Sequence, residues 1–183
     1  ADDKIAWYEN DGSENFTEHT ISTSADKANH VYAEDVDGDG DMDVLSASRA
    51  DDKIAWYEND GSESFTEHEI STTADRANDV HAADVDGDGD MDVLSASGRD
   101  NKIAWYENNG SESFTEHTIS TSAVNTWSLH AEDVDGDGDM DVLSASNDDD
   151  KIAWYENDGS ESFTEHAIST SADGAYDVYA IDV

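Results

Sequence analysis

The sequence DVDGDGDMD occupies residues 35–43 and returns 49 residues further on each time, at 84–92 and at 133–141. Five carboxylates stand at alternate positions of these nine residues, where they repel one another unless a cation lies between them. Donors made only of oxygen, with no histidine or cysteine among them, favour Ca²⁺ over zinc or copper. Gly38 and Gly40 let the backbone turn sharply, so that the carboxylates can converge. The stretch therefore predicts a calcium-binding loop, present three times.

Each loop contributes ligands of two kinds. Positions 1, 3, 5 and 9 are the expected side-chain ligands, and position 7, Asp41 in the first loop, is expected to bind through its backbone carbonyl. Asp182 occupies the first position of a fourth, truncated loop. The candidate metal ligands of the three complete loops are Asp35, Asp37, Asp39, Asp41, Asp43, Asp84, Asp86, Asp88, Asp90, Asp92, Asp133, Asp135, Asp137, Asp139 and Asp141.

Other acidic, glycine-containing motifs fit this pattern less well. An EF-hand needs a bidentate glutamate at position 12, but that position holds Ser46, Ser95 or Ser144, within a short run of β character. Dockerin-like modules fail for the same reasons, and the nonapeptide calcium solenoid has a loop every nine residues instead of every 49. An acidic, solvated turn that binds nothing is the remaining alternative, and three copies of one spacing argue against it.

The composition restricts the partners. The chain has 183 residues, and its 47 acidic and 8 basic residues give a net charge of −39. Such a surface repels phosphate backbones and anionic lipid, so neither nucleic acid nor direct membrane insertion is expected. The chain has no cysteine, and no apolar run approaches the roughly 18 residues that span a bilayer. Calcium at extracellular concentration could stabilise the fold as disulfides do elsewhere, which predicts an extracellular protein, secreted or at the cell surface.

Each 49-residue repeat contains four runs of β character. The run KIAWYEN, at residues 4–10 in its first copy, has apolar side chains on both faces, which predicts a strand covered on both sides. A tight turn over 10–13 then leads to a more polar strand over 16–21, which suits an outer edge. A third strand over 30–34 enters the calcium loop, and a fourth over 44–48 leaves it.

Four short antiparallel strands per repeat predict an all-β protein built of β-propeller blades. A linear stack of four-stranded units is the alternative architecture. The chain forms a single array of about 3.7 blades. Its repeat equivalents are 1–49, 50–98, 99–147 and 148–183.

A ring closed from these repeats alone would lack one inner strand, so we expect a segment of a longer array or one completed by other chains. The two end blades would then expose Trp7 and Tyr8 at one end, and Trp154 and Tyr155 at the other. Such surfaces predict blade-on-blade packing with further repeats or other copies of the chain. Contacts of this head-to-tail kind close into a ring or propagate as a filament.

The calcium loop, the strand after it and the tryptophan-bearing strand together resemble the FG-GAP/VCBS-type repeat, which builds the integrin α-subunit propeller and many bacterial surface proteins. The resemblance covers the whole chain. It implies that each loop joins the two inner strands of a blade and holds Ca²⁺ on one face of the disc. The chain has no proline and no Phe-Gly pair, so integrin partners are not implied, and the bacterial secreted branch is the nearer resemblance.

Differences between the repeats gather before the third strand, at residues 27–30 and their copies, and after the fourth, at 49–50 and theirs. Both segments are expected on the face opposite the calcium loops. They are either drifting solvent-exposed loops or a recognition face on which Trp127 and Tyr176 stack against a sugar or a protein. Histidine recurs once in every repeat, first as His19, which favours packing or hydrogen bonding in the outer strand over catalysis.

These features favour a non-catalytic, Ca²⁺-stabilised repeat module, used in adhesion or as an extracellular scaffold. Near-identical repeats argue against an enzyme, because catalysis needs one asymmetric constellation of residues. A carbohydrate-binding, lectin-like propeller is the alternative function, and its partner would be a glycan or a surface protein. A Ca²⁺-dependent extracellular hydrolase is the third hypothesis.

Overall fold

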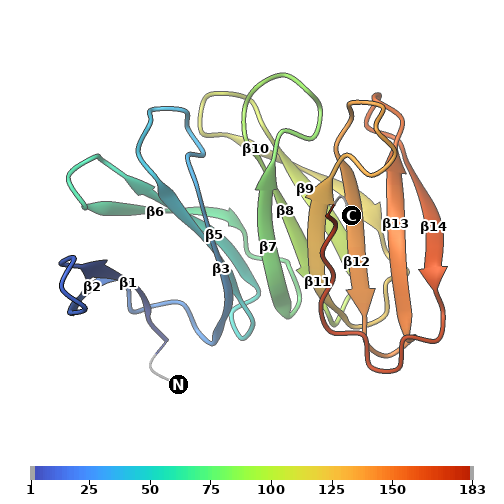
Figure 1. Ribbon diagram of the computed structural model, residues 1–183, viewed down its shortest axis with the longest axis horizontal. Coiled ribbons are helices and arrows are strands. Elements are labelled where there is room, and N and C mark those ends of the chain that lie inside the picture. Colours follow the sequence, from blue (N-terminus) through green and yellow to red (C-terminus); the bar gives the residue numbers. More distant parts are fainter. Residues whose placement is uncertain (1–2, 182–183) are drawn as a thin grey trace.

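The computed structural model describes residues 3–181, whose regular structure is entirely β (Figure 1). One two-stranded hairpin, β1 (Ile5–Asn10) with β2 (Phe16–Ser22), precedes three four-stranded antiparallel blades. The first blade contains β3 (Ala28–Glu34), β4 (Asp43–Ser48), β5 (Lys53–Asn59) and β6 (Phe65–Ser71). The second contains β7 (Ala77–Ala83), β8 (Asp92–Ser97), β9 (Lys102–Asn108) and β10 (Phe114–Ser120). The third contains β11 (Thr126–Glu132), β12 (Asp141–Ser146), β13 (Lys151–Asn157) and β14 (Phe163–Ser169).

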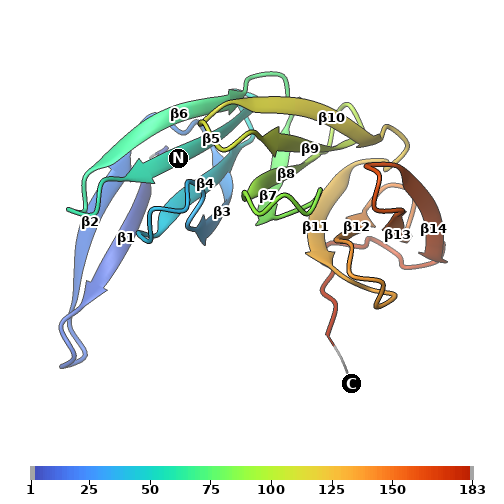
Figure 2. The same ribbon diagram turned by 90° about the horizontal axis from the view of Figure 1, so that it is seen from above.

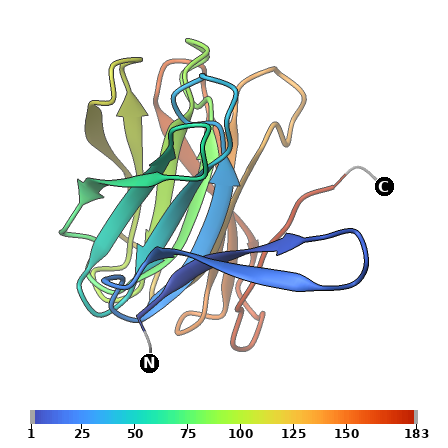
Figure 3. The ribbon, with the colours of Figure 1, turned by 90° about the vertical axis from the view of Figure 1, so that its left-hand side faces the viewer.

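The blades stand side by side around a common axis. Viewed from above, β3, β7 and β11 line the concave side, while β6, β10 and β14 form the outer rim (Figure 2). The hairpin β1–β2 lies against the first blade at one end of the array (Figure 3). This arrangement confirms the predicted propeller blades, with the predicted polar strand at the outer edge. No helix within residues 3–181 is long and apolar enough to cross a membrane.

Each blade takes its strands from two successive sequence repeats. The acidic loop joins the two inner strands, β3 and β4 in the first blade, and the tryptophan-bearing β5 from the next repeat adds to them. The boundaries 1–49, 50–98, 99–147 and 148–183 therefore mark sequence copies, whereas the complete blades run over 28–71, 77–120 and 126–169.

The seams between blades form the core. On β5, Ile54 and Trp56 pack against the second blade, where Tyr106 lies in the same buried cluster. On the other side of β5, Tyr57 is buried with Ile5 of the hairpin. The alternation of apolar side chains along KIAWYEN thus covers both faces of one strand, as the sequence predicted.

The hairpin connections differ from the predicted tight turn over residues 10–13. The loop between β1 and β2 has five residues, in which Gly12 and Glu14 have φ angles of 76° and 66°. Asp11 organises this loop, because its Oδ1 accepts a 2.7 Å hydrogen bond from the Ser13 N–H and its own N–H donates to the Asn15 carbonyl. The prediction of a tight turn was wrong because a side-chain-capped loop with two left-handed residues uses the same residue types.

The expectation for the end blades was half right. Tyr8 is 55% exposed and Trp7 is half-buried, but Tyr155 is only 1% exposed, while Trp154 is half-buried. Tyr155 is buried because its side of β13 faces the second blade, where it lies in one cluster with Trp105. In each KIAWYEN strand the tyrosine faces the preceding blade and the tryptophan faces the following one, so the prediction that Tyr155 is exposed was wrong.

Candidate metal centres

The backbone of each acidic loop wraps around the carboxylate at its first position. Asp35 accepts hydrogen bonds from the Gly38 N–H at 2.9 Å and the Gly40 N–H at 3.0 Å, one at each carboxylate oxygen. Gly38 and Gly40 have φ angles of 75° and 98°, a region that favours glycine. The second and third loops repeat these contacts at Asp84 and Asp133. The glycines therefore serve the turning role predicted for them.

Carboxylates converge in all three loops. In each loop one oxygen from each of three aspartates lies within 4.8 Å of the other two. The first position and the third take part in every loop, whereas the third member is the fifth position in the first loop and the ninth in the others. The three groups are Asp35, Asp37 and Asp39; Asp84, Asp86 and Asp92; and Asp133, Asp135 and Asp141. The structure thus brings nine of the fifteen candidate ligands together, and leaves Asp41, Asp43, Asp88, Asp90, Asp137 and Asp139 outside these groups.

The ninth position is buried and anchored. Asp92 is fully buried, and its carboxylate accepts hydrogen bonds from the Val85 N–H at 2.9 Å and the Asn108 N–H at 2.8 Å. Burial, together with the nearby carboxylates of Asp86 and Asp88, raises the pKa of Asp92 to about 7. A bound divalent cation opposes both effects, because it favours the charged form of each carboxylate.

The seventh position points its side chain away from the loop. The carboxylate of Asp90 lies against Gly110 of the β9–β10 connection, where a Cβ atom on the glycine would come within 2.5 Å of Asp90 Oδ2. The same contact pairs Asp41 with Gly61 and Asp139 with Gly159. This placement leaves only the backbone of the seventh position near the loop centre, and ligation through its carbonyl stays a prediction.

An asparagine ends each KIAWYEN strand, and it has a structural role that was not predicted from the sequence. Asn108 is buried, and its side-chain NH₂ donates to the Met91 carbonyl at 3.1 Å and to the Val36 carbonyl of the preceding blade at 3.2 Å. Asn157 makes the equivalent bond to Val85 at 3.0 Å. One side chain thereby holds two neighbouring acidic loops. The recurrence of asparagine at this position in all four repeats is the sequence feature that could have indicated its role.

The recurrent histidine lies on the outer strand, as predicted. His117 stacks on Trp105 with ring centroids 4.6 Å apart, and its Nε2 lies 2.8 Å from Glu107 Oε2. Equivalent contacts bind His68 to Trp56 and Glu58. These contacts support the interpretation of this histidine as a packing and hydrogen-bonding residue.

The variable segments lie together on the face opposite the acidic loops. Trp127 stacks on Tyr176 at 4.5 Å between centroids, and the Arg49 guanidinium lies 4.6 Å from the Trp127 ring centroid. A surface cavity of about 270 Å³ beside them is lined by Asn29, Asn78 and Asp79, among others. Aromatic rings, amides and a carboxylate thus border one hollow, where both aromatic residues singled out from the sequence meet.

A column of rings lines the concave side of the array. Tyr32, His81, His130 and Tyr179 follow one another with centroids 4.3, 5.2 and 4.4 Å apart. They border a cavity of about 570 Å³. Burial, with the neighbouring imidazole of His130, lowers the pKa of His81 to about 4. The two histidines stand where tyrosines stand in the flanking repeats, so the interpretation of this position as an aromatic site agrees with the packing.

Comparison with known proteins identifies both the repeat and the fold. The chain matches the FG-GAP-like repeat over residues 1–46, 35–95, 84–144 and 133–183. No curated protein matches it. Among solved structures, it is similar to a lectin of Agrocybe aegerita, described as recognising non-reducing terminal N-acetylglucosamine, with 18% sequence identity and a TM-score of 0.62. The similarity covers 94% of this chain and 48% of the lectin, so the chain spans about half of the lectin's length. The chain belongs to the FG-GAP-like repeat family and has the β-propeller fold.

Proposed function

We propose that the chain is a non-catalytic, Ca²⁺-stabilised repeat module of a secreted or cell-surface protein, acting in adhesion or as an extracellular scaffold. One observation carries the calcium assignment: three carboxylate oxygens converge within 4.8 Å in each of three equivalent loops. All-oxygen donors on flexible, glycine-containing loops suit Ca²⁺, which takes six to eight oxygen ligands. The remaining predicted side chain, at the ninth position of the first loop and the fifth of the other two, would complete each set together with the backbone carbonyl of the seventh position and water.

Calcium removal tests this assignment through stability. Extracellular calcium modules bind with dissociation constants of about 10⁻⁴ to 10⁻³ M. At about 10 mM free Ca²⁺, each site then stabilises the folded protein by about 1.4–2.7 kcal/mol. Thermal unfolding in excess Ca²⁺ and in EDTA measures the difference. An unchanged midpoint of unfolding would contradict the proposal.

Two matched variants assign the ligands in the first loop. Asp37→Asn should remove one Ca²⁺ from the stoichiometry measured by calorimetry, because its side chain belongs to the converging group. Asp41→Asn should retain all three, because its carboxylate lies against Gly61 and only its carbonyl is proposed to bind. Equal losses in the two variants would show that the seventh side chain is also a ligand.

The end faces of the array support a role in assembly. Tyr8 and Phe16 at one end are 55% and 64% exposed, and Tyr179 and Ile181 at the other are 71% and 72% exposed. Monomeric proteins rarely leave such apolar groups uncovered at one surface. We infer that further repeats, or other copies of the chain, cover them through the same blade-on-blade packing as the internal seams. Light scattering of the chain in calcium and moderate salt, where the charge of −39 is screened, should detect association, and a stable monomer would contradict self-association.

Carbohydrate binding is the second candidate function, and the stacked Trp127 and Tyr176 beside Arg49 and Asn29 favour it. Aromatic faces pack against sugar rings while amides and charged groups orient the hydroxyls. The lectin that shares the fold recognises terminal N-acetylglucosamine, which makes a glycan ending in this sugar the first probe. Trp127→Ala should abolish binding on a glycan array, whereas Phe16→Ala, at the far end of the array, should leave it unchanged. If the chain binds no glycan on the array, carbohydrate binding is contradicted and the scaffold role is favoured.

A further inference from the structure

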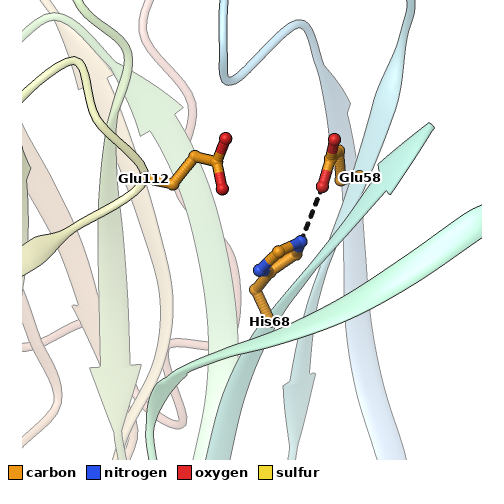
Figure 4. A group of neighbouring side chains, drawn as sticks. All are labelled: Glu58, His68 and Glu112. Atoms are coloured by element: carbon orange, nitrogen blue, oxygen red, sulfur yellow. Dashed lines mark hydrogen bonds and ion pairs between the residues drawn. The ribbon is translucent and has the colours of Figure 1, made fainter. Parts of the chain in front are cut away.

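Outside the acidic loops, three metal-ligating side chains meet at the seam between the first and second blades (Figure 4). Glu58 projects from β5, His68 from β6, and Glu112 from the connection between β9 and β10. One ligand atom from each lies within 4.8 Å of the other two. The three residues therefore come from three separate segments and from two different blades.

Packing positions the first two of these side chains before any ligand binds. His68 stacks on Trp56 with centroids 4.6 Å apart and planes at 26°, and its Nε2 lies 2.7 Å from Glu58 Oε2. Trp56 is 1% exposed, so it holds the imidazole against a rigid surface. Such support is what a metal-ligating histidine needs from its surroundings.

The third side chain is brought to the pair by the second blade. Phe114, two residues after Glu112, packs edge-on against Trp56 at 6.3 Å between centroids. The same tryptophan thus contacts the histidine of one blade and the segment that carries the glutamate of the next. Figure 4 shows the Glu112 carboxylate turned towards the Glu58–His68 pair across the seam.

Charge in this cluster is unbalanced. Two carboxylates face one imidazole, and Glu112 forms no ion pair with a lysine or arginine in the described part of the chain, residues 3–181. Two carboxylates this close repel each other, and a cation between them turns the repulsion into attraction. The net charge of the whole chain, −39, also concentrates divalent cations at its surface.

We propose that Glu58, His68 and Glu112 form a second class of metal site, which binds Zn²⁺ and clamps the first blade to the second. The donor set is the basis for the choice of metal. One imidazole nitrogen with two carboxylate oxygens suits zinc, which binds nitrogen and oxygen donors of these kinds at open sites with three protein ligands and water in the fourth position. Ca²⁺ selects the all-oxygen loops instead, so the two metals occupy different sites on one chain.

The repeats supply matched controls for two of the three ligands, His68 and Glu112. His166 stacks on Trp154 at 4.7 Å and lies 2.6 Å from Glu156, as His68 does with its own partners, but the described residues place no third ligand there. Glu14 occupies the position of Glu112 in the β1–β2 connection and has a similar φ, 66° against 59°. Each control variant therefore makes the same chemical change without removing a member of the cluster.

The test is a Zn²⁺ titration of the full chain by calorimetry, with Ca²⁺ saturating so that the acidic loops are filled. The wild-type chain and the His166→Gln and Glu14→Gln variants should bind Zn²⁺ equally well. His68→Gln and Glu112→Gln should each weaken this binding about tenfold or more. Zn²⁺ should also raise the midpoint of thermal unfolding of the wild-type chain but not of Glu112→Gln, because only the complete cluster joins two blades.

Two results would overturn the proposal. One is the absence of Zn²⁺ binding to the calcium-saturated wild-type chain. The other is binding that Glu112→Gln leaves unchanged, which would assign the zinc to a His–Glu pair within a single blade. Circular dichroism of each variant in calcium, without zinc, verifies that a lost site does not reflect an unfolded chain.

Discussion

Replacing His81 with tyrosine should make the folded protein more resistant to acid. His81 lies in the column of rings on the concave side, between Tyr32 and His130, and burial there lowers its pKa to about 4. Its value in the unfolded chain is about 6.5. Between these two values the unfolded chain binds a proton that the folded chain does not, so stability falls as the pH falls. Tyrosine occupies the equivalent positions, 32 and 179, and carries no such proton.

The size of the effect follows from the two pKa values. A pKa difference of about 2.5 corresponds to about 3 kcal/mol of stability, present above pH 6.5 and lost as the pH falls through 4. At pH 5 about 2 kcal/mol of this is already lost, which lowers the midpoint of thermal unfolding by about 4–8 °C in a chain of this size.

Thermal unfolding of the wild-type chain and of His81→Tyr at pH 7 and pH 5, both in saturating Ca²⁺, measures this contribution. The carboxylates titrate alike in the two proteins, so the difference between their pH dependences isolates the imidazole. The wild-type chain should lose more stability than the variant between the two pH values. Equal losses would refute the reasoning, because they would mean that the folded chain takes up the proton on His81 at no cost.

Three other changes test the loops and their supports by thermal unfolding. Gly12→Ala should cost about 1–2 kcal/mol of stability, because Gly12 has a positive φ. Gly61→Ala should cost more, because Gly61 also has a positive φ and the added Cβ would meet the Asp41 carboxylate. Equal costs would contradict that contact. Asn108→Ala should cost about 2–4 kcal/mol, because it removes the donor of a buried hydrogen bond to the Val36 carbonyl and of a partly buried one to the Met91 carbonyl. A cost below about 0.5 kcal/mol would show that water replaces the amide. Stabilisation by Ca²⁺ should be larger at pH 8 than at pH 5.5. The reason is that burial raises the pKa of Asp92 to about 7, so that a proton on this carboxylate competes with the metal at the lower pH. Stabilisation that does not depend on pH would exclude Asp92 as a ligand.

The repeat period and the alternation of side chains carried enough information to predict the fold. Ile54 and Trp56 on one side of a strand, with Tyr57 on the other, require cover on both faces, and only stacked sheets provide it. The acidic spacing likewise predicted three equivalent loops, whose glycines do adopt positive φ. These are local properties, and each is repeated often enough to stand out from a single sequence.

Relations across a seam could not be predicted in this way. Asn108 bonds to a carbonyl 72 residues earlier, and Glu112 approaches His68 only because two blades lie side by side. Which side of β13 faces the preceding blade depends on the direction of stacking, and this is why Tyr155 is buried against expectation. Contacts between residues of neighbouring blades depend on the rotation from one blade to the next, and the sequence of a single repeat does not reveal this rotation.

The strands of each blade come from two successive sequence copies, and this affects how a chain of this kind can change its number of blades. Since β3 and β4 come from one sequence copy and β5 and β6 from the next, every 49-residue copy contributes to two blades. Recombination between copies joins equivalent positions wherever the crossover falls, so the product contains whole blades and intact seams. In a stacked array each unit contacts only its neighbours, and insertion of one copy therefore disturbs no distant contact. We therefore expect that adding or removing one 49-residue copy changes the number of blades while the remaining blades keep their contacts.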